Sequence, residues 1–139
     1  MIKKNETGRS MVEMLGVLAI VGVLSVAGIR GYTVAMRKYR ANEIANAISL
    51  MGATMKTTNE VIDAQHPKSY QDLLDVSSDP SGVDRLEAIS DTEVVLEADS
   101  EELCDAVASL FGTNNHNPSY VDADDCDDDD HSLHIIIRN

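Results

Sequence analysis

The chain has 139 residues, no tryptophan and a single phenylalanine, so it offers little aromatic surface on which nucleic-acid bases could stack. It also has few basic residues beyond its first forty. Residues 41–139 carry a charge of −18, which together with the +5 of residues 1–40 makes the net charge of −13. Because so acidic a region repels phosphate, we expect no nucleic acid among the partners of this part of the chain.

The segment from Met11 to Ile29 lacks proline and has only one charged residue, Glu13. As a helix, these residues span about 30 Å, the thickness of a bilayer core. A secretory signal peptide has a shorter apolar core, and a buried helix of a soluble protein has a polar face. The segment therefore predicts a membrane-spanning helix, with a cleaved signal peptide and a simple single-span anchor as alternatives.

Glu13 is the unusual residue of this segment. An ionised carboxylate beside an apolar phase costs free energy unless it is paired, so an acid in this place is a candidate functional residue. The alternative is a carboxylate at the depth of the lipid headgroups, where water solvates it. The residue by itself leaves both interpretations open.

The residues around Glu13 carry a resemblance to a known family. The sequence Gly8-Arg9-Ser10-Met11-Val12-Glu13, followed by the apolar run, resembles the class III signal of type IV pilins and type II secretion pseudopilins. In that family a short basic leader ends in Gly, cleavage follows the Gly, and the fifth residue of the mature chain is Glu. The resemblance covers roughly residues 1–45.

The resemblance implies a division of the chain and a role for its first residues. Residues 1–8 would be a leader, 9–30 a transmembrane and assembly helix, 31–62 the amphipathic half of that helix, and 63–139 a globular α+β head with an acidic loop. Cleavage would fall between Gly8 and Arg9, with N-methylation at Arg9, although the family usually has Phe, Met or Leu there. Glu13 would pair with the new α-amino group of a neighbouring subunit. Arg30 stands where many members have a helix-kinking Pro, so we expect a continuous helix.

The partners and the location follow from the same resemblance. We expect contacts with prepilin peptidase, with the inner-membrane assembly platform and with further copies of the chain in a filament. The protein would cross the bacterial inner membrane once before assembly, and afterwards it would lie in a pilus at the cell surface or in a periplasmic pseudopilus. The alternatives are a type II secretion pseudopilin and a membrane-anchored binding module with an uncleaved leader. The chain has no Ser/His/Asp order, phosphate loop or zincin signature, so we expect no enzyme activity.

The rest of the chain predicts an α+β fold, in which the long N-terminal helix packs against a small, mainly antiparallel sheet. A stripe of residues at helical spacing continues to residue 62 and comprises Ala41, Ile44, Ile48, Met51, Met55, Thr58 and Ile62. Residues 63–90 have the composition of a loop-rich connector with a short helix capped by Ser69. We expect strands at 92–97, 120–121 and 132–138, and a helix from Asp99 or Ser100 to Leu110.

Cys104 and Cys126 are the two cysteines, 22 residues apart and not in a CxxC pair. In a cytosolic chain they would be two free thiols, and a zinc site would need further ligands. The resemblance places the head outside the cytoplasm, where disulfides persist. The order of strand, helix, two cysteines and last strand also resembles the type IVb pilin branch, which implies a Cys104–Cys126 disulfide bounding the C-terminal region.

A dense group of aspartates follows residue 121. It can be a solvated acidic loop or a Ca²⁺ site, since Ca²⁺ binds six to eight oxygen ligands, but its spacing does not match an EF-hand. The candidate calcium ligands are Asp122, Asp124, Asp125, Asp127 and Asp128. His131 and His134 follow the group, and for these we expect a role on the surface of a strand rather than metal binding.

Overall fold

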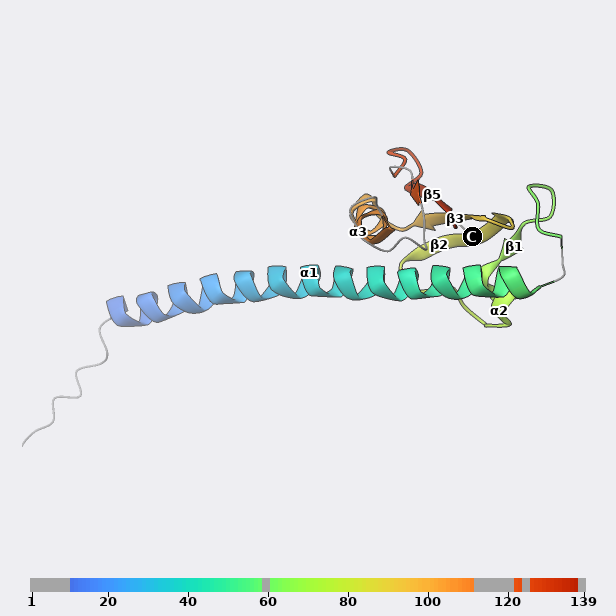
Figure 1. The fold of residues 1–139 in the computed structure, drawn as a ribbon. Helices are drawn as coiled ribbons and strands as arrows, with labels where there is room; N and C mark the ends of the chain where they lie inside the picture. The colour runs from blue at the N-terminus through green and yellow to red at the C-terminus, as the bar shows by residue number, and fades with distance from the viewer. Residues whose placement is uncertain (1–10, 59–60, 112–121, 124–125, 138–139) are drawn as a thin grey trace, which may run out of the picture. The chain divides into compact units, whose positions relative to one another are not determined.

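A computed structural model describes residues 11–58, 61–111, 122–123 and 126–137 of the chain (Figure 1). The chain divides into two units, Met1–Met36 and Arg37–Asn139. We call the first the apolar unit and the second the folded unit. The helix α1, Met11–Thr57, contributes residues to both units.

In the folded unit, α1 buries one side of its surface. The buried residues recur about every three or four positions, with neighbouring pairs at 47–48 and 51–52, which places them on one face of a helix. They are Ala41, Ile44, Ala47, Ile48, Met51, Gly52 and Met55. The predicted helical stripe is therefore confirmed as far as Met55.

The prediction that the helix continues to residue 62 is wrong, because α1 ends at Thr57. Its last turns are rich in threonine, and the hydroxyls of Thr54 and Thr57 donate hydrogen bonds to the carbonyls of Leu50 and Thr54, at 3.0 and 2.9 Å. Such local hydrogen bonds and β-branching weaken a helix. Ile62 is still buried, at 4% exposure, but it joins the core from outside the helix.

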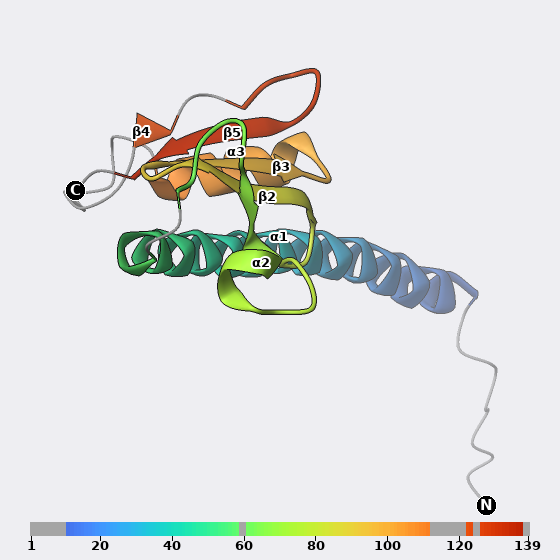
Figure 2. The same cartoon turned by 90° about the vertical axis from the view of Figure 1, so that its right-hand side faces the viewer.

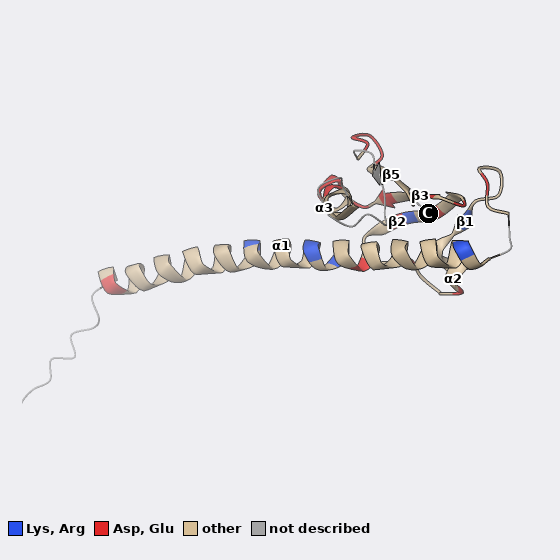
Figure 3. Cartoon of the chain, in the orientation of Figure 1, with Lys and Arg blue, Asp and Glu red and all other residues tan. Residues whose placement is uncertain are grey.

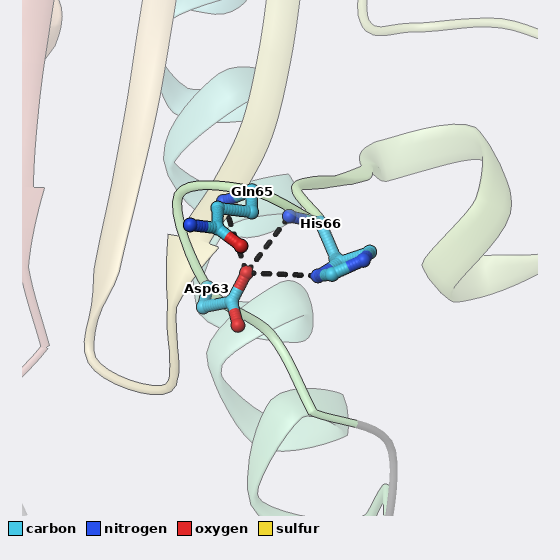
Figure 4. A network of polar contacts seen from close by, with 3 residues as sticks. All are labelled: Asp63, Gln65 and His66. Carbon is cyan, nitrogen blue, oxygen red and sulfur yellow. Dashed lines mark hydrogen bonds and ion pairs between the residues drawn. The ribbon is translucent and has the colours of Figure 1, made fainter.

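A tight turn follows at Asp63–His66 (Figure 4). The Oδ1 atom of Asp63 accepts hydrogen bonds from the backbone N–H groups of Gln65 and His66, at 2.9 and 2.8 Å, and lies 3.1 Å from Nδ1 of His66. The hydrogen bond with the His66 side chain, helped by the two backbone bonds, lowers the pKa of the Asp63 carboxyl. The turn is thus held by a carboxylate that favours its ionised form.

The described part of the chain forms an antiparallel sheet of five strands in the order β1-β2-β3-β5-β4. The strands are β1, Lys68–Ser69; β2, Val83–Ser90; β3, Glu93–Ala98; β4, Asp122–Ala123; and β5, Ser132–Ile136. The central strands β3 and β5 confirm the predicted strands at 92–97 and 132–138 within one or two residues of the described ends. The strand expected at 120–121 lies outside the described residues.

The interpretation of residues 63–90 as a loop-rich connector is wrong in its second half, because β2 occupies Val83–Ser90. Only Leu86 and Ala88 of this strand are fully buried, and the pairing with β3 shifts register at two places. These shifts interrupt the regular alternation of apolar and polar residues by which a strand is read from sequence. β2 turns directly into β3 through Asp91 and Thr92.

The helices of the folded unit begin where the sequence predicts. α2, Tyr70–Leu74, follows the N-cap Ser69, whose hydroxyl accepts the N–H of Asp72 at 3.1 Å. α3, Glu101–Phe111, begins directly after Ser100, and the N–H groups of Leu103 and Cys104 bond to the Ser100 carbonyl. The expected helix up to Leu110 is confirmed and is one residue longer.

One hydrophobic core joins the sheet to both long helices, which confirms the α+β fold. Its largest fully buried side chains come from α1, α3 and the strands β2, β3 and β5: Ile44, Ile48, Met51, Leu86, Val94, Leu96, Cys104, Val107, Leu133 and Ile135. Both views show the sheet extended along α1 (Figures 1 and 2). The face of the sheet away from this core carries polar pairs: Arg85 Nε lies 3.2 Å from Glu97 Oε2, and His134 Nδ1 lies 2.9 Å from Glu93 Oε1.

Two glycines permit close approach inside this core. A side-chain carbon at Gly82 would lie 2.6 Å from Leu103 Cδ2, and its φ of +88° disfavours other residues. A side-chain carbon at Gly52 would lie 2.8 Å from Cδ1 of Ile137. The helix α1 and the end of the last strand can therefore pack closely because residue 52 has no side chain.

Candidate functional site: the apolar helix and the bridged acidic segment

The first candidate site is the surface of α1 in the apolar unit. Every residue from Met11 to Ala35 is exposed, including Leu18 at 65% and Val23 at 71%. Among the described residues, α1 is the one helix long and apolar enough to cross a membrane. Leaving such a surface in water costs about 25 cal/mol per Å², so a helix exposed in this way favours an apolar environment.

The polar atoms of this helix are arranged to suit that environment. The Ser25 hydroxyl donates to the carbonyl of Val21 at 2.8 Å, and the Thr33 hydroxyl donates to the carbonyl of Arg30 at 2.9 Å. Each hydroxyl proton is thus satisfied within the helix and needs no water. Proline is absent from α1, and the helix passes through Arg30 without a break, as the sequence predicts.

Four described glycines of the apolar unit leave gaps in the side-chain surface. A side-chain carbon added at Gly16, Gly22, Gly28 or Gly31 would meet nothing within 4 Å. The first three are each six residues from the next, about 240° around a helix with 3.6 residues per turn, so they lie on three different sides. Small residues let another helix approach closely. The surface is therefore suited to helices on several sides rather than to one partner.

Glu13 lies in the first turn of α1 and is exposed. It is the only charged residue between Met11 and Ile29. Its predicted partner, the α-amino group of Arg9 on another copy, and the cleavage site at Gly8 and Arg9 lie outside the described residues. Their roles and the N-methylation of Arg9 remain predictions.

The second candidate site is the C-terminal segment bounded by a disulfide. Cys104 Sγ and Cys126 Sγ are bonded at 2.05 Å, with the Cα atoms 6.1 Å apart, as the sequence predicts. Cys104 is completely buried on α3, whereas Cys126 precedes β5 and is half-buried. The bond therefore attaches the acidic segment to the core.

The described aspartates of this segment form hydrogen bonds within a turn. The N–H of Asp127 donates to the Ser132 carbonyl, and the N–H of His131 donates to the Asp127 carbonyl, both at 3.0 Å. Oδ1 of Asp127 accepts the N–H of Asp129, and Oδ1 of Asp130 accepts the N–H of Ser132. Hydrogen bonds with the side chain and the backbone of Ser132 lower the pKa of the Asp130 carboxyl.

The calcium prediction is not decided by this geometry. Asp127 and Asp128 are exposed, Asp122 is described only as part of β4, and Asp124 and Asp125 lie outside the described residues. Within the described ranges, no group of three or more His, Cys, Asp or Glu side chains is placed to hold a metal ion. Calcium binding by these five aspartates remains a prediction.

The two histidines after the aspartates differ. His134 is exposed on β5 and contacts Glu93 of the adjacent strand, in line with the expected role on a strand surface. His131 is half-buried with a φ of 53°, and its Nδ1 is covered without a hydrogen-bond partner in the described structure. Its backbone carbonyl accepts the N–H of Ala98, which fixes the turn to β3. No spacing or motif along the chain indicates this backbone role.

Fold and site together define an α+β unit carried on a long, exposed apolar helix. Comparisons with models of protein families, with curated proteins and with solved structures gave no match. Function is therefore inferred from the chain's own residues and geometry.

Proposed function

We propose that the chain is a subunit of a type IV pilus, either a pilin or a pilin-like protein. It is stored in the bacterial inner membrane through α1, cleaved by prepilin peptidase between Gly8 and Arg9, and added to a filament by the assembly platform. The observation that carries the proposal is the continuous helix Met11–Thr57, whose first half is apolar and exposed and whose second half buries one face in the folded unit. A filament of such subunits covers the exposed half with copies of itself.

The proposal gives Glu13 a physical role. Cleavage after Gly8 creates a new α-amino group on Arg9, four residues from Glu13. In an apolar bundle, a cation and a carboxylate attract each other far more strongly than they do in water. If the α-amino group of one copy pairs with Glu13 of the next, both charges are neutralised and the two helices acquire a fixed offset. The apolar side chains and the glycines then provide the packing.

The test compares filament assembly and membrane insertion for Glu13→Ala and Glu13→Gln. We expect much less protein in filaments sheared from the cell surface, because the carboxylate that pairs with the α-amino group is removed. The amount in the inner membrane should not fall, since losing a charge makes the span more apolar. Glu101→Ala, which removes an exposed glutamate of α3, is the control and should assemble normally.

Three results would contradict the proposal or part of it. Glu13 variants that enter filaments at the normal rate would remove the role of the carboxylate. A chain that stays in the membrane with its leader intact and never polymerises would favour the membrane-anchored binding module. A polymer confined to the periplasm would instead identify a type II secretion pseudopilin.

A further inference from the structure

The folded unit has a hollow beside α1 that the assembly of apolar helices does not use. It has a volume of about 400 Å³ and lies between α1 and the segment formed by α2 and residues 76–80. Figure 2 shows α2 and the following loop beside α1. Side chains of both kinds line the hollow: Glu43, Asn46, Leu50, Tyr70, Val76 and Asp79.

The charges of this hollow are not neutralised within the described residues. Glu43 is exposed and forms no ion pair there. Asp79 is half-buried; its Oδ2 accepts a hydrogen bond from the neutral amide of Gln71 at 2.9 Å, and its Oδ1 is covered without any partner. A carboxylate that is partly removed from water and lacks a cation is unfavourable. The arrival of a cation in the hollow would relieve this cost.

The walls also suit a particular kind of cation. Leu50 is 53% exposed and Val76 is 40% exposed, and both line the hollow with Tyr70. Lysine and arginine have a long apolar stem that packs on such surfaces while the charged end reaches a carboxylate. The combination of apolar walls and two carboxylates therefore fits a basic side chain better than a free metal ion.

A matching group of cations lies just before the hollow along the same helix. We call Arg30–Arg40 the basic band; it contains Arg30, Arg37, Lys38 and Arg40 and no acid. Figure 3 shows basic residues gathered in the middle of α1 and acidic residues on α3 and in the loops around the sheet. Arg37 lies 3.9 Å from Glu102 of its own chain, whereas Arg30 and Lys38 are exposed and have no ion pair among the described residues.

We propose that this hollow receives a basic side chain, Arg30 or Lys38, from the basic band of a second copy of the chain. The inference rests on the proposed function, because staggered parallel helices bring the band and the hollow to the same level. Lys38 precedes Glu43 by 5 residues and Arg30 precedes Leu50 by 20. At 1.5 Å per residue, any stagger of about 8–30 Å in that sense places the band of one copy beside the hollow of another.

The contact adds selectivity to assembly. Apolar helices pack on one another with little discrimination, whereas a cation fits the hollow only at certain offsets between copies. A wrong offset either brings carboxylates of two copies together or leaves the cation and the carboxylates of the hollow unpaired. Each of these costs free energy. The contact between the folded units therefore adds a second constraint on the stagger, beside the one that pairing at Glu13 provides.

The experiment measures sheared filament from cells that express charge-reversed variants of the full chain. Arg30→Glu, Lys38→Glu and Glu43→Lys exchange exposed side chains, so we expect folding and the disulfide to be retained. Reversal of the cation that enters the hollow should lower the assembled protein about tenfold, and so should Glu43→Lys, because each places like charges together. Combining the two should restore assembly. Lys56→Glu makes the same change in an exposed lysine near the end of α1 and should have no effect.

A second measurement locates the contact directly. Carbodiimide coupling of filaments that contain subunits of two nitrogen isotopes should join Lys38, or the side chain of an Arg30→Lys variant, to Glu43 or Asp79. Peptides of mixed isotope composition show that the bond joins two copies. Lys38→Arg keeps the charge but removes the amine, so assembly should persist while any coupling at that position disappears.

The outcomes separate this inference from the proposed function. Normal assembly of all three reversals, with assembly still lost in Glu13→Ala, overturns the hollow as a contact and leaves the pilin proposal intact. Failure of every combined reversal to restore assembly, together with no mixed-isotope peptide, also overturns it. A wild-type chain that does not polymerise overturns both proposals.

Discussion

The two parts of α1 differ in how much of their apolar surface is buried. From Ala41 to Met55 the chain buries its own apolar stripe under a sheet and a second helix, whereas from Met11 to Ala35 every side chain is exposed. Both parts are helical, so local sequence preference alone does not distinguish them. What differs is the presence of a polar face: the buried part has one, and the exposed part has apolar residues all around. A helix without a polar face is typical of a protein core or a membrane span.

The largest expected effect compares one truncation in each part. Ile48 is 1% exposed, so Ile48→Ala should lower the free energy of unfolding of the folded unit by about 2–5 kcal/mol through lost burial and a cavity. Leu18→Ala removes a similar volume from a side chain of the apolar unit that is 65% exposed, and it should leave this free energy unchanged. Urea unfolding of the full chain in detergent micelles, followed by near-ultraviolet circular dichroism, measures both. Equal effects would show that the two parts are not independent.

Reduction of the Cys104–Cys126 bond should have the second-largest effect on the stability of the folded unit. Closing a loop between residues 22 apart stabilises a fold by about 3 kcal/mol, chiefly through the unfolded chain. Without the bond, we expect the acidic segment between Phe111 and Ser132 to become accessible first, because it has few apolar residues with which to repay its ordering entropy. β4 covers the outer side of β5, so loss of β4 leaves the Ile-rich strand as an open edge.

Limited proteolysis with endoproteinase Asp-N, with and without reductant, tests this order. Cleavage within the acidic segment should precede any loss of the core, and α1 in the micelle should be unaffected. Equal protection in both conditions would show that the bond does not hold the segment. If added Ca²⁺ but not Mg²⁺ restored protection to the reduced chain, the predicted calcium site would gain support.

Acid should produce the smallest effect, and only in the folded unit. Hydrogen bonds lower the pKa of Asp63, through His66, and of Asp130, through Ser132, below the ordinary value of 3.8. A lowered pKa in the folded state means that the stabilisation is complete above the ordinary value and is lost as pH falls through the folded value. Asp63→Asn and Asp130→Asn should therefore flatten the loss of stability below about pH 4. Carbon-detected NMR titration of both carboxyls checks the direction, and a midpoint above 3.8 would contradict it.

Features governed by local sequence could be predicted. The absence of proline and charge predicts the first half of α1, the spacing from Ala41 to Met55 predicts its buried face, and Ser69 and Ser100 mark the starts of helices. Among the candidate site residues, the pairing of Cys104 with Cys126 is confirmed. The exposure of Glu13 is observed, while its partner lies outside the described residues.

Features governed by tertiary contacts could not be predicted. β2 was missed because its polar residues and register shifts hide the alternation, and its place in the sheet depends on pairing with β3. The end of α1 was misplaced because Ile62 is buried without being helical. The hollow beside α1 depends on how the loop containing Asp79 folds back against the helix, which no spacing along the chain reveals.

The most direct test of the central claim is the intact mass of the protein in the inner membrane and in sheared surface filaments. The account predicts a mature chain that begins at Arg9 in the filaments, with residues 1–8 removed and the disulfide formed. The same mature form should accumulate in the membrane when assembly is blocked. A chain that still carries Met1–Gly8 in both fractions, or that is found in no polymer, would contradict the claim that copies of this protein cover its apolar helix.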